Sequence, residues 1–394
     1  MPDKILTTHT GSLVRPEELL VYLRAKRDGV VVDEDAYQKT LQHHVDDVVR
    51  RQAETGIDIV NDGEYSNTHS WWGYIRERLT GFSQRPWPDG VRDEPERRGR
   101  DRTEFAAFYE EYNRQAMPEA PVAQDGQWVC TGPVEYVGYD AVQANIDRLK
   151  AATQSADIQG AFIPVVTPGS AAPFRRDEFY PTEEEFIFAI ADALNKEYRA
   201  IADAGFIVQV DDAFMATMYD SVVPPGTFAD YLAWAEVRLE ALRRALAGVP
   251  PELSRYHLCW GSWNGPHAYD VELKDIVGLV LRIPVGAYAI EQANPRHEHE
   301  WRVWEDTELP DGKVLIPGVI SHATNVVEHP ELVAERLERL ARIVGPERVL
   351  ASTDCGFAQG PFLRRVHPSI QWAKLEALAE GARIASRSLA SFAG

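Results

Sequence analysis

Two residues of metal-binding type stand two positions apart in this sequence. His257 and Cys259 lie in a run of residues that favours a β-strand, and residues two apart on a strand point to the same face. Glu291 ends the next predicted strand, and Cys355 ends the last one. An imidazole, two thiolates and a carboxylate are a suitable tetrahedral set for zinc. The sequence therefore predicts a zinc site, with the alternative that each residue is an ordinary part of the buried core.

Further polar residues stand at the carboxyl ends of other predicted strands. The first strand runs into residues 8–12, the second ends in residues 61–64, and the fifth ends in Asp211 and Asp212. In a parallel α/β barrel the active site lies at the carboxyl ends of the strands. We therefore expect these side chains to share one mouth with the zinc ligands.

The elements that must position these residues alternate along the chain. Short runs rich in β-forming residues are followed by long amphipathic stretches, which is typical of a parallel sheet with helical crossovers. The predicted strands span residues 5–9, 58–61, 128–131, 161–166, 206–210, 256–260, 287–290, 314–319 and 348–352. The predicted helices span residues 36–55, 141–153, 183–204, 228–246, 330–344 and 370–390.

This alternation predicts an α/β fold, a (β/α)8 TIM barrel that residues 1–394 form as a single catalytic domain. Nine predicted strands are one more than the barrel needs, and the sequence does not indicate which strand is accessory. The alternative is an open doubly wound sheet, but no G-x-G-x-x-G motif follows a predicted strand. Residues 83–127 are polar and rich in Arg, Asp, Glu and Pro, so we expect them to form an insertion after the second strand, partly helical around residues 104–115.

Composition restricts the partners of the protein. The 394 residues carry a formal net charge of −20, which would repel nucleic acid and anionic membranes. We expect neither as a partner, and expect small molecules instead. Three widely spaced cysteines do not form a disulfide framework, and no apolar stretch reaches the ~18 residues that span a bilayer. With no signal peptide recognised, we expect a cytoplasmic protein, and the sequence leaves open whether it forms a homo-oligomer.

Three segments that carry the candidate ligands resemble a known family. HLCWGSWNG at 257–265, AIEQAN at 289–294 and STDCGF at 352–357 resemble the zinc-binding strands of cobalamin-independent methionine synthase. The resemblance implies that the zinc ligands are the four residues His257, Cys259, Glu291 and Cys355. It also implies a zinc-dependent enzyme that activates a small thiol as a thiolate and alkylates it.

The resemblance extends in order over nearly the whole chain. TTHTGS, which ends at Ser12, resembles the turn that holds the homocysteine carboxylate in this family, and implies that Gly11 and Ser12 bind it. GIDIVNDGE, which ends at Glu64, resembles the segment whose glutamate binds the amine. GFIVQVDD resembles the strand whose aspartate binds the same amine, which implies that role for Asp211.

Other comparisons with the family concern proton transfer and the alkyl donor. A family histidine proposed to assist proton transfer has a counterpart in His322, with a one-residue shift in GVISHATN, and we expect His322 and Asp211 to be catalytic. Two-barrel members carry an N-terminal barrel that this sequence does not contain. The family's folate-stacking tryptophan would fall near Thr167, in VVTPGSAAP. We therefore expect an alkyl donor other than a folate polyglutamate.

The sequence thus predicts transfer of a methyl or other alkyl group to a small thiol, with homocysteine giving methionine as the leading reaction. One alternative is alkylation of another thiol, such as coenzyme M, by an epoxide. Another is a zinc-dependent lyase or hydrolase, which needs a metal position open to water. A non-catalytic zinc barrel is a further alternative, which the polar residues expected at the same mouth disfavour.

Overall fold

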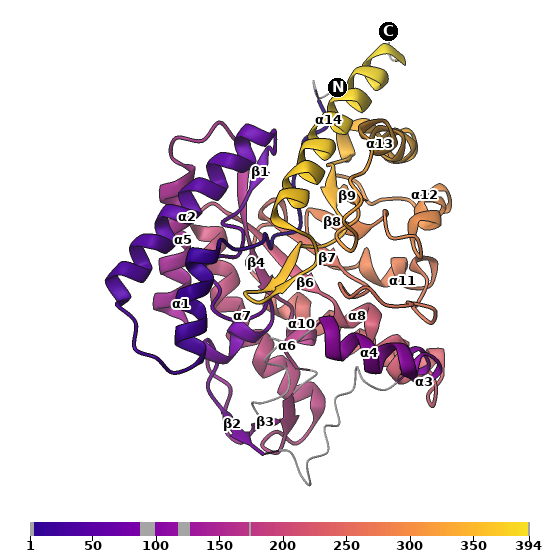
Figure 1. Cartoon of the computed structure of the whole chain (residues 1–394). Coiled ribbons are helices and arrows are strands. Elements are labelled where there is room, and N and C mark those ends of the chain that lie inside the picture. The colour runs from indigo at the N-terminus through magenta and orange to yellow at the C-terminus, as the bar shows by residue number, and fades with distance from the viewer. Residues whose placement is uncertain (1–3, 87–98, 117–126, 173–174, 393–394) are drawn as a thin grey trace.

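The centre of the protein is a curled parallel sheet (Figure 1). This computed structural model describes residues 4–86, 99–116, 127–172 and 175–392. Across the sheet the strands are β1 (Ile59–Val60), β4 (Gly160–Val166), β6 (Ile207–Asp212), β7 (Ser254–Leu258), β8 (Ala287–Glu291), β9 (Val314–Ile320) and β10 (Ser352–Thr353). Each neighbouring pair is parallel, so the carboxyl ends of all these strands lie at the same end of the sheet.

Residues 6–8 are hydrogen bonded to both edges of this sheet. On one side, the amide of Thr8 donates to the carbonyl of Ala351 at 2.8 Å. On the other side, the amide of Asp58 donates to the carbonyl of Thr7 at 3.0 Å. The Asp58 carboxylate in turn accepts a hydrogen bond from the Thr7 amide at 2.9 Å. The first predicted strand therefore lies between β1 and the chain that leads into β10.

Long helices surround the sheet, and all six predicted helices are present with ends within two residues of those predicted. They are α2 (Glu34–Thr55), α5 (Tyr139–Thr153), α7 (Glu183–Asp203), α10 (Phe228–Ala245), α13 (Pro330–Val344) and α14 (Pro368–Phe392). Their beginnings are set by local signals: Thr182 caps α7, and Thr227 forms a capping box with Asp230 in α10. No helix in the described part of the chain is both long and apolar enough to cross a membrane.

Two helices of eight or more residues were not predicted, α1 (Glu17–Arg27) and α11 (Leu273–Val280). In α11 half of the residues are buried apolar side chains. Periodicity alone cannot distinguish so short an apolar helix from a buried strand. Shorter elements complete the chain: α6 (Pro168–Ala171), α8 (Phe214–Thr217), α9 (Tyr219–Val222), α12 (Val303–Asp306), the hairpin β11 (Ala358–Gly360) and β12 (Leu363–Arg364), and 3-10 helices at Gly73–Glu77, Pro251–Leu253, Glu298–Arg302 and Pro346–Arg348.

A separate three-stranded sheet contains β2 (Phe82–Arg85), β3 (Gln127–Cys130) and β5 (Arg175–Asp177). The predicted strand at 128–131 is therefore the accessory one, because β3 pairs with β2 and β5 and not with the central sheet. Between β2 and β3 lie α3 (Arg100–Glu104) and α4 (Ala106–Ala116), where a partly helical segment was expected. Residues 87–98 and 117–126 of the predicted insertion lie outside the described residues.

Candidate active site

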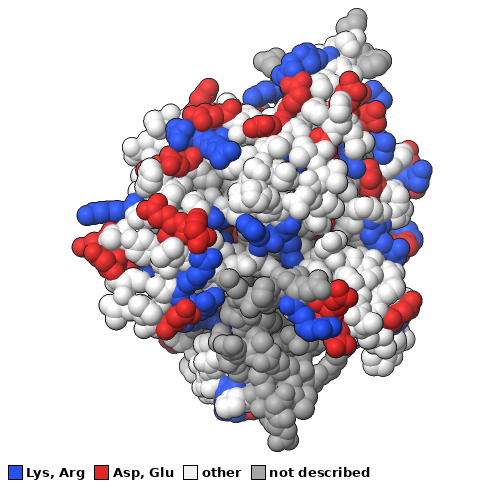
Figure 2. Space-filling view, viewed as in Figure 1, with Lys and Arg blue, Asp and Glu red and all other residues white. Residues whose placement is uncertain are grey.

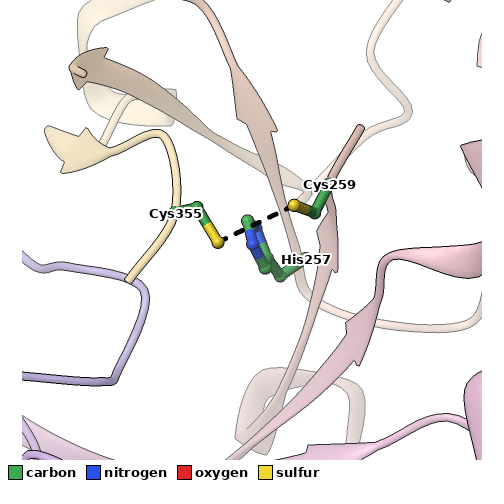
Figure 3. A group of neighbouring side chains, drawn as sticks. All are labelled: His257, Cys259 and Cys355. Atoms are coloured by element: carbon green, nitrogen blue, oxygen red, sulfur yellow. Dashed lines mark hydrogen bonds between the residues drawn. The ribbon is translucent and has the colours of Figure 1, made fainter. Parts of the chain in front are cut away.

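His257, Cys259 and Cys355 lie together at the carboxyl end of the central sheet (Figure 3). His257 is on β7, and the amide of Cys259, just after β7, donates to the carbonyl of Asp212 on β6 at 3.1 Å. This pairing continues the ladder, so the side chains two positions apart share a face. The sulfur atoms of Cys259 and Cys355 are 3.7 Å apart, and one ligand atom from each of the three residues lies within 4.8 Å of the others.

The atoms of this cluster have surroundings that fit a metal ion. Both ring nitrogens of His257 are buried without a hydrogen-bond partner among the described residues. Burial, assisted by the charge of Arg255, lowers the pKa of His257 to about 3, so the imidazole is neutral and has a lone pair to offer. The hydrogen bond to Cys355 and burial raise the pKa of the Cys259 thiol, and a bound cation would oppose that rise. One imidazole and two thiols are a donor set that zinc prefers.

Glu291, the fourth predicted ligand, lies near this cluster, but its carboxylate contacts other groups. It ends β8 and is fully buried. Its Oε1 accepts a hydrogen bond from the amide of Trp260 at 3.2 Å, and its Oε2 accepts one from the side chain of Asn294 at 3.2 Å. Because Trp260 directly follows Cys259, the first of these bonds places the Glu291 carboxylate beside the cluster. The structure thus groups three of the predicted ligands and keeps the fourth beside them.

Asp354 connects the last strand to the chain that follows Glu291. Its Oδ1 accepts hydrogen bonds from the amides of Gln292 and Ala293, each at 2.9 Å. Burial and then the charge of Glu291 raise the pKa of the Asp354 carboxyl well above its ordinary value. Because Asp354 directly precedes Cys355, these bonds fix the position of that thiol relative to β8.

Glu64 and Asp211 form a buried acidic pair at the same end of the sheet. Burial and then the charge of Asp211 raise the pKa of Glu64 well above its ordinary value. Burial also raises the pKa of Asp211 to about 8, although its carboxylate accepts a hydrogen bond from Gln209 at 2.8 Å. The nearby Arg15 opposes the rise at Glu64, but its guanidinium donates to the Glu64 carbonyl and not to the carboxylate. Two neighbouring buried acids of this kind favour the binding of a cation between them.

Gly11 and Ser12 lie between the acidic pair and the thiol cluster. Gly11 has a φ of +127°, and a Cβ at this position would lie 2.7 Å from Oε1 of Glu64, so only glycine fits. The carbonyl of Ser12 accepts a hydrogen bond from the amide of Phe357 at 2.8 Å. The Ser12 hydroxyl occupies the place that a side chain at Gly356 would need. The turn therefore contacts the acidic pair on one side and the segment after the second cysteine on the other.

His322 follows β9, and both of its ring nitrogens are buried without a partner among the described residues. Burial, followed by the charges of Arg365, His267 and His257, lowers its pKa to about 3, so the ring is neutral at neutral pH. With His322, every predicted site residue lies in the carboxyl-terminal part of a strand of the central sheet or in the loop that follows it, including the loop after the first predicted strand. These residues are Gly11, Ser12, Glu64, Asp211, His257, Cys259, Glu291, His322 and Cys355.

Gln209 and Arg255, which join the first segment to β6 and β7, were not predicted as site residues. The guanidinium of Arg255 donates to the side chain of Gln209 at 2.7 Å and to the carbonyl of His9 at 3.0 Å. Burial lowers the pKa of Arg255 to about 9, so it remains charged at neutral pH. A signal was present, because Gln209 and Arg255 stand two positions before Asp211 and His257 and so share their faces of the strands.

A buried row of hydrogen-bonded side chains, two histidines and two carboxylates, lies near Glu291 and was not predicted from the sequence. Oδ2 of Asp270 lies 2.9 Å from a ring nitrogen of His267 and 3.0 Å from one of His297. The other nitrogen of His297 lies 2.9 Å from a carboxylate oxygen of Glu300. Burial opposes a charge on His297, but its bonds to Asp270 and Glu300 and their attraction outweigh burial and raise its pKa to about 9. The positive charge of His297 in turn favours the ionised form of Glu291.

The parallel sheet and the cluster at its carboxyl end define an α/β protein with a candidate metal centre of one imidazole and two thiols. The family described as "Cobalamin-independent synthase, Catalytic domain" matches residues 171–369, and the chain belongs to the cobalamin-independent methionine synthase family. That match includes the three clustered residues and His322.

Relatives match along most of the chain. A methionine synthase of Saccharolobus islandicus is 25% identical over 385 residues, which cover 97% of this chain and 95% of the relative. A methionine synthase of Sulfolobus acidocaldarius is 24% identical over 366 residues, which cover 90% of this chain and 87% of the relative. The solved structure of a B12-independent methionine synthase from Shewanella sp. W3-18-1, in complex with selenomethionine, has a TM-score of 0.71 at 20% identity and covers 98% of this chain and 99% of that chain. This likeness shows that the fold is shared.

The charged His297 makes the stability of the fold sensitive to alkaline pH. The pKa of His297 is about 9 in the folded protein, compared with 6.5 for an ordinary histidine. Its contribution to the free energy of unfolding is therefore complete below pH 6.5 and is lost as the pH rises through 9. We expect His297→Gln to remove a pH-dependent contribution of about 3 kcal/mol to the free energy of unfolding. Urea unfolding at several pH values between about 6 and 10 measures it. His299→Gln, at an exposed position nearby, is the control and should keep the wild-type pH dependence. If the free energy of unfolding of His297→Gln varies with pH as in the wild type, His297 is not the charged group.

Proposed function

We propose that the protein transfers a methyl or other small alkyl group to the thiol of homocysteine, and that it holds zinc through His257, Cys259 and Cys355. The observation that carries this proposal is the cluster of one imidazole and two thiols close to a buried acidic pair. The names of the relatives support it, because the chain matches two methionine synthases over most of their length. The bound selenomethionine in the similar Shewanella enzyme also agrees with an amino-acid substrate.

We also infer that residues 6–8 act as the eighth strand of a closed (β/α)8 barrel. Their hydrogen bonds to both edges of the sheet support this inference. In this arrangement residues 1–394 form one catalytic domain, and residues 83–127 form an insertion after the second strand of the barrel. The antiparallel pairing of β2 with β3 supports the insertion, because it brings the two ends of that segment together.

The residues of the cluster suit zinc, and Glu291 would complete the set of ligands when no thiol is bound. Bound zinc would keep a substrate thiol deprotonated at neutral pH, where a free thiol with a pKa of about 8.5 is only a few per cent thiolate. The amide of Trp260 and the side chain of Asn294 hold the Glu291 carboxylate beside the cluster, where it would be available as a further ligand. Asp354 holds the residues that follow Glu291 and directly precedes Cys355, so it would fix these two candidate ligands relative to each other.

The amino-acid end of homocysteine fits the other half of the mouth. Glu64 and Asp211 would bind the ammonium group, which would favour the ionised form of both carboxyls and so offset the effect of their burial. Ser12 and the backbone at Gly11 would bind the carboxylate. Because this turn also contacts the segment after Cys355, the same residues would set the distance between the amino-acid end and the sulfur.

The reaction is a substitution at an alkyl carbon. The thiolate forms a carbon–sulfur bond while the bond between that carbon and the leaving atom breaks, and the leaving atom keeps the electron pair and needs a proton. His322 is neutral at neutral pH, so it would act as a relay that gives up one ring proton while it receives another. Asp211, the second residue predicted to be catalytic, has a pKa of about 8 in the site without substrate, so it would carry a proton there until the ammonium group binds.

We propose that the alkyl donor is smaller than a folate polyglutamate. The position where the resemblance expects a stacking aromatic is Thr167, and its side chain caps α6 by accepting a hydrogen bond from the amide of Ser170 at 3.1 Å. Thr167 is buried, so it offers no surface for a pterin ring. Aromatic stacking contributes roughly 0.5–1.5 kcal/mol beyond burial. A small methyl donor is the leading candidate, and an epoxide is the second.

The metal assignment predicts about one zinc per chain in purified protein, because the cluster forms a single site. Cys259→Ser and Cys355→Ser should lose the metal on dialysis against a weak chelator, as measured by elemental analysis. Cys130→Ser is the matched control: Cys130 lies on β3, outside the cluster, and its replacement should leave the zinc content unchanged. Wild-type protein without zinc, or tight retention by Cys355→Ser, would show the assignment to be wrong.

The amine assignment predicts that Asp211→Asn and Glu64→Gln each weaken homocysteine binding by about tenfold or more. A charge-assisted hydrogen bond is worth ~1.5–3 kcal/mol, and each variant removes one. Calorimetric titration of zinc-loaded protein measures the affinity. The control ligand is 4-mercaptobutyrate, which has the sulfur and the carboxylate but no amine, and its affinity should not fall in either variant. Unchanged homocysteine affinity in both variants would refute the assignment.

The reaction itself is tested with zinc-loaded protein, homocysteine and a panel of alkyl donors. The panel contains methyltetrahydrofolate as the mono- and triglutamate, methylcobalamin and a small epoxide. We expect product from a small donor, detected by mass spectrometry, and none with Cys355→Ser. Methionine formed fastest from the triglutamate would refute the donor proposal only. Absence of both product formation and homocysteine binding would refute the proposed function.

A further inference from the structure

Arg365 places a positive charge at the mouth of the site. It follows β12, and its amide donates to the carbonyl of Phe357 at 2.9 Å, so the hairpin holds it beside the segment that follows Cys355. Figure 2 shows lysine and arginine side chains near the centre of this face, where Figure 1 has the β11–β12 hairpin. The residue is half-buried, so part of its charge is shielded from water.

The guanidinium of Arg365 contacts only neutral groups among the described residues. Its Nε donates to the side chain of Gln359 at 2.7 Å, and one terminal nitrogen donates to the hydroxyl of Tyr112 at 3.0 Å. The other terminal nitrogen lies 3.4 Å from the hydroxyl of Ser262. A guanidinium has five N–H donors, so two have no partner among the described residues, where no carboxylate pairs with Arg365 either.

Three segments meet around this cation. Tyr112 comes from α4, in the predicted insertion, and its hydroxyl also accepts a hydrogen bond from the amide of Asn264 at 3.4 Å. Ser262 lies three residues after Cys259, in the loop that follows β7. Gln359 is fixed by a hydrogen bond from its side chain to the carbonyl of Gly356 at 2.6 Å. The partners of Arg365 are therefore anchored to the chain beside both clustered cysteines.

Several other arginines of this acidic protein pair with a carboxylate. Arg282 on the surface pairs with Glu236, and Arg244 pairs with Asp192. Arg336, which is mostly buried, pairs with Glu298 at 2.9 Å. A bound anion would give the half-buried Arg365 charge-assisted hydrogen bonds, which are stronger than those it makes to its neutral partners. The charge of Arg365 also reaches His322, which has two unpaired ring nitrogens and lies beside the cluster.

We propose that Arg365, Tyr112 and Ser262 form a binding site for an anionic group, a carboxylate, on the alkyl donor. The proposal rests on the proposed function, and it gives the insertion a role, because α4 supplies one of the three side chains. The carboxylate would accept hydrogen bonds from the two N–H groups of Arg365 that have no partner among the described residues, in the bidentate geometry that this pair favours. The donor would then be held by its charged end while its alkyl carbon faces the sulfur.

Two thioethers of homocysteine test the proposal by equilibrium binding. S-carboxymethyl-homocysteine carries a carboxylate on the donor side of the sulfur, and S-carbamoylmethyl-homocysteine carries a neutral amide of the same shape. Calorimetry with zinc-loaded wild-type protein should give at least about tenfold tighter binding of the carboxylate. Arg365→Gln should abolish the preference, and Arg365→Lys should keep part of it. Arg364→Gln, at the exposed neighbour on β12, is the matched control and should keep all of it.

Each outcome has a distinct meaning. A preference that persists in Arg365→Gln, or its absence in the wild type, overturns the proposal. Homocysteine itself should bind the wild type and Arg365→Gln equally. If the variant binds homocysteine more weakly but binds 3-aminopropanethiol, which lacks the carboxylate, as well as the wild type does, Arg365 contacts the carboxylate of the thiol substrate. That result would overturn the assignment of Arg365 to the donor. Failure of homocysteine to bind the wild type refutes the proposed function. In that case the anion site is tested separately, by measuring the melting temperature with and without inorganic phosphate. Phosphate should raise the melting temperature of the wild type and of Arg364→Gln but not that of Arg365→Gln.

Discussion

The hydrogen bonds of residues 6–8 to both edges of the parallel sheet are the constraint on which the site depends. They bring the first segment of the chain between β1 and the residues before β10. The turn at Gly11 and Ser12 consequently contacts Glu64 after the second strand and Phe357 after the last one. Because the strands are parallel, their carboxyl ends meet at one mouth, and residues from opposite ends of the sequence become neighbours there.

Burial shifts the pKa values of the groups at this mouth, and the charges around each group decide whether its pKa rises or falls. No carboxylate offsets the burial of His257 and His322 among the described residues, so burial lowers their pKa values and keeps both imidazoles neutral. His297 is also buried, but two carboxylates surround it and keep it charged. Burial raises the pKa values of Glu64 and Asp211, although the charges of Arg15 and Arg255 oppose the rise. The site therefore presents neutral nitrogen and sulfur donors on one side and a receptor for a cation on the other.

Net charge and local charge differ in this protein. A formal charge of −20 gives the surface no long-range attraction for anions. Within the mouth, Arg365 has only neutral partners among the described residues, and they come from α4, from the loop after β7 and from the hairpin after β10. A positive group at that position acts over a few ångströms. It would therefore distinguish ligands by direct contact and would not attract them from a distance. Helix α4 and the loops after β7 and β10 thus meet at the position where a charged group of a ligand would bind.

The sequence by itself determined the α/β class, the six long helices and the identity of the chemical groups. Alternation of strands and helices requires no tertiary information, and the spacing of His257 and Cys259 fixes a shared face through the two-residue period of a strand. The tertiary structure decided which of the nine strands is accessory, because pairing partners far apart in sequence leave no local pattern. Only the tertiary structure revealed the hydrogen-bonded side chains that link His267 to Glu300. The same is true of the neutral partners of Arg365, because in both cases the contacts join separate loops. The tertiary structure also decided that Glu291 rests on Trp260 and Asn294 while the other three candidates cluster, because residue type predicts what can bind a metal, whereas packing determines where each side chain points.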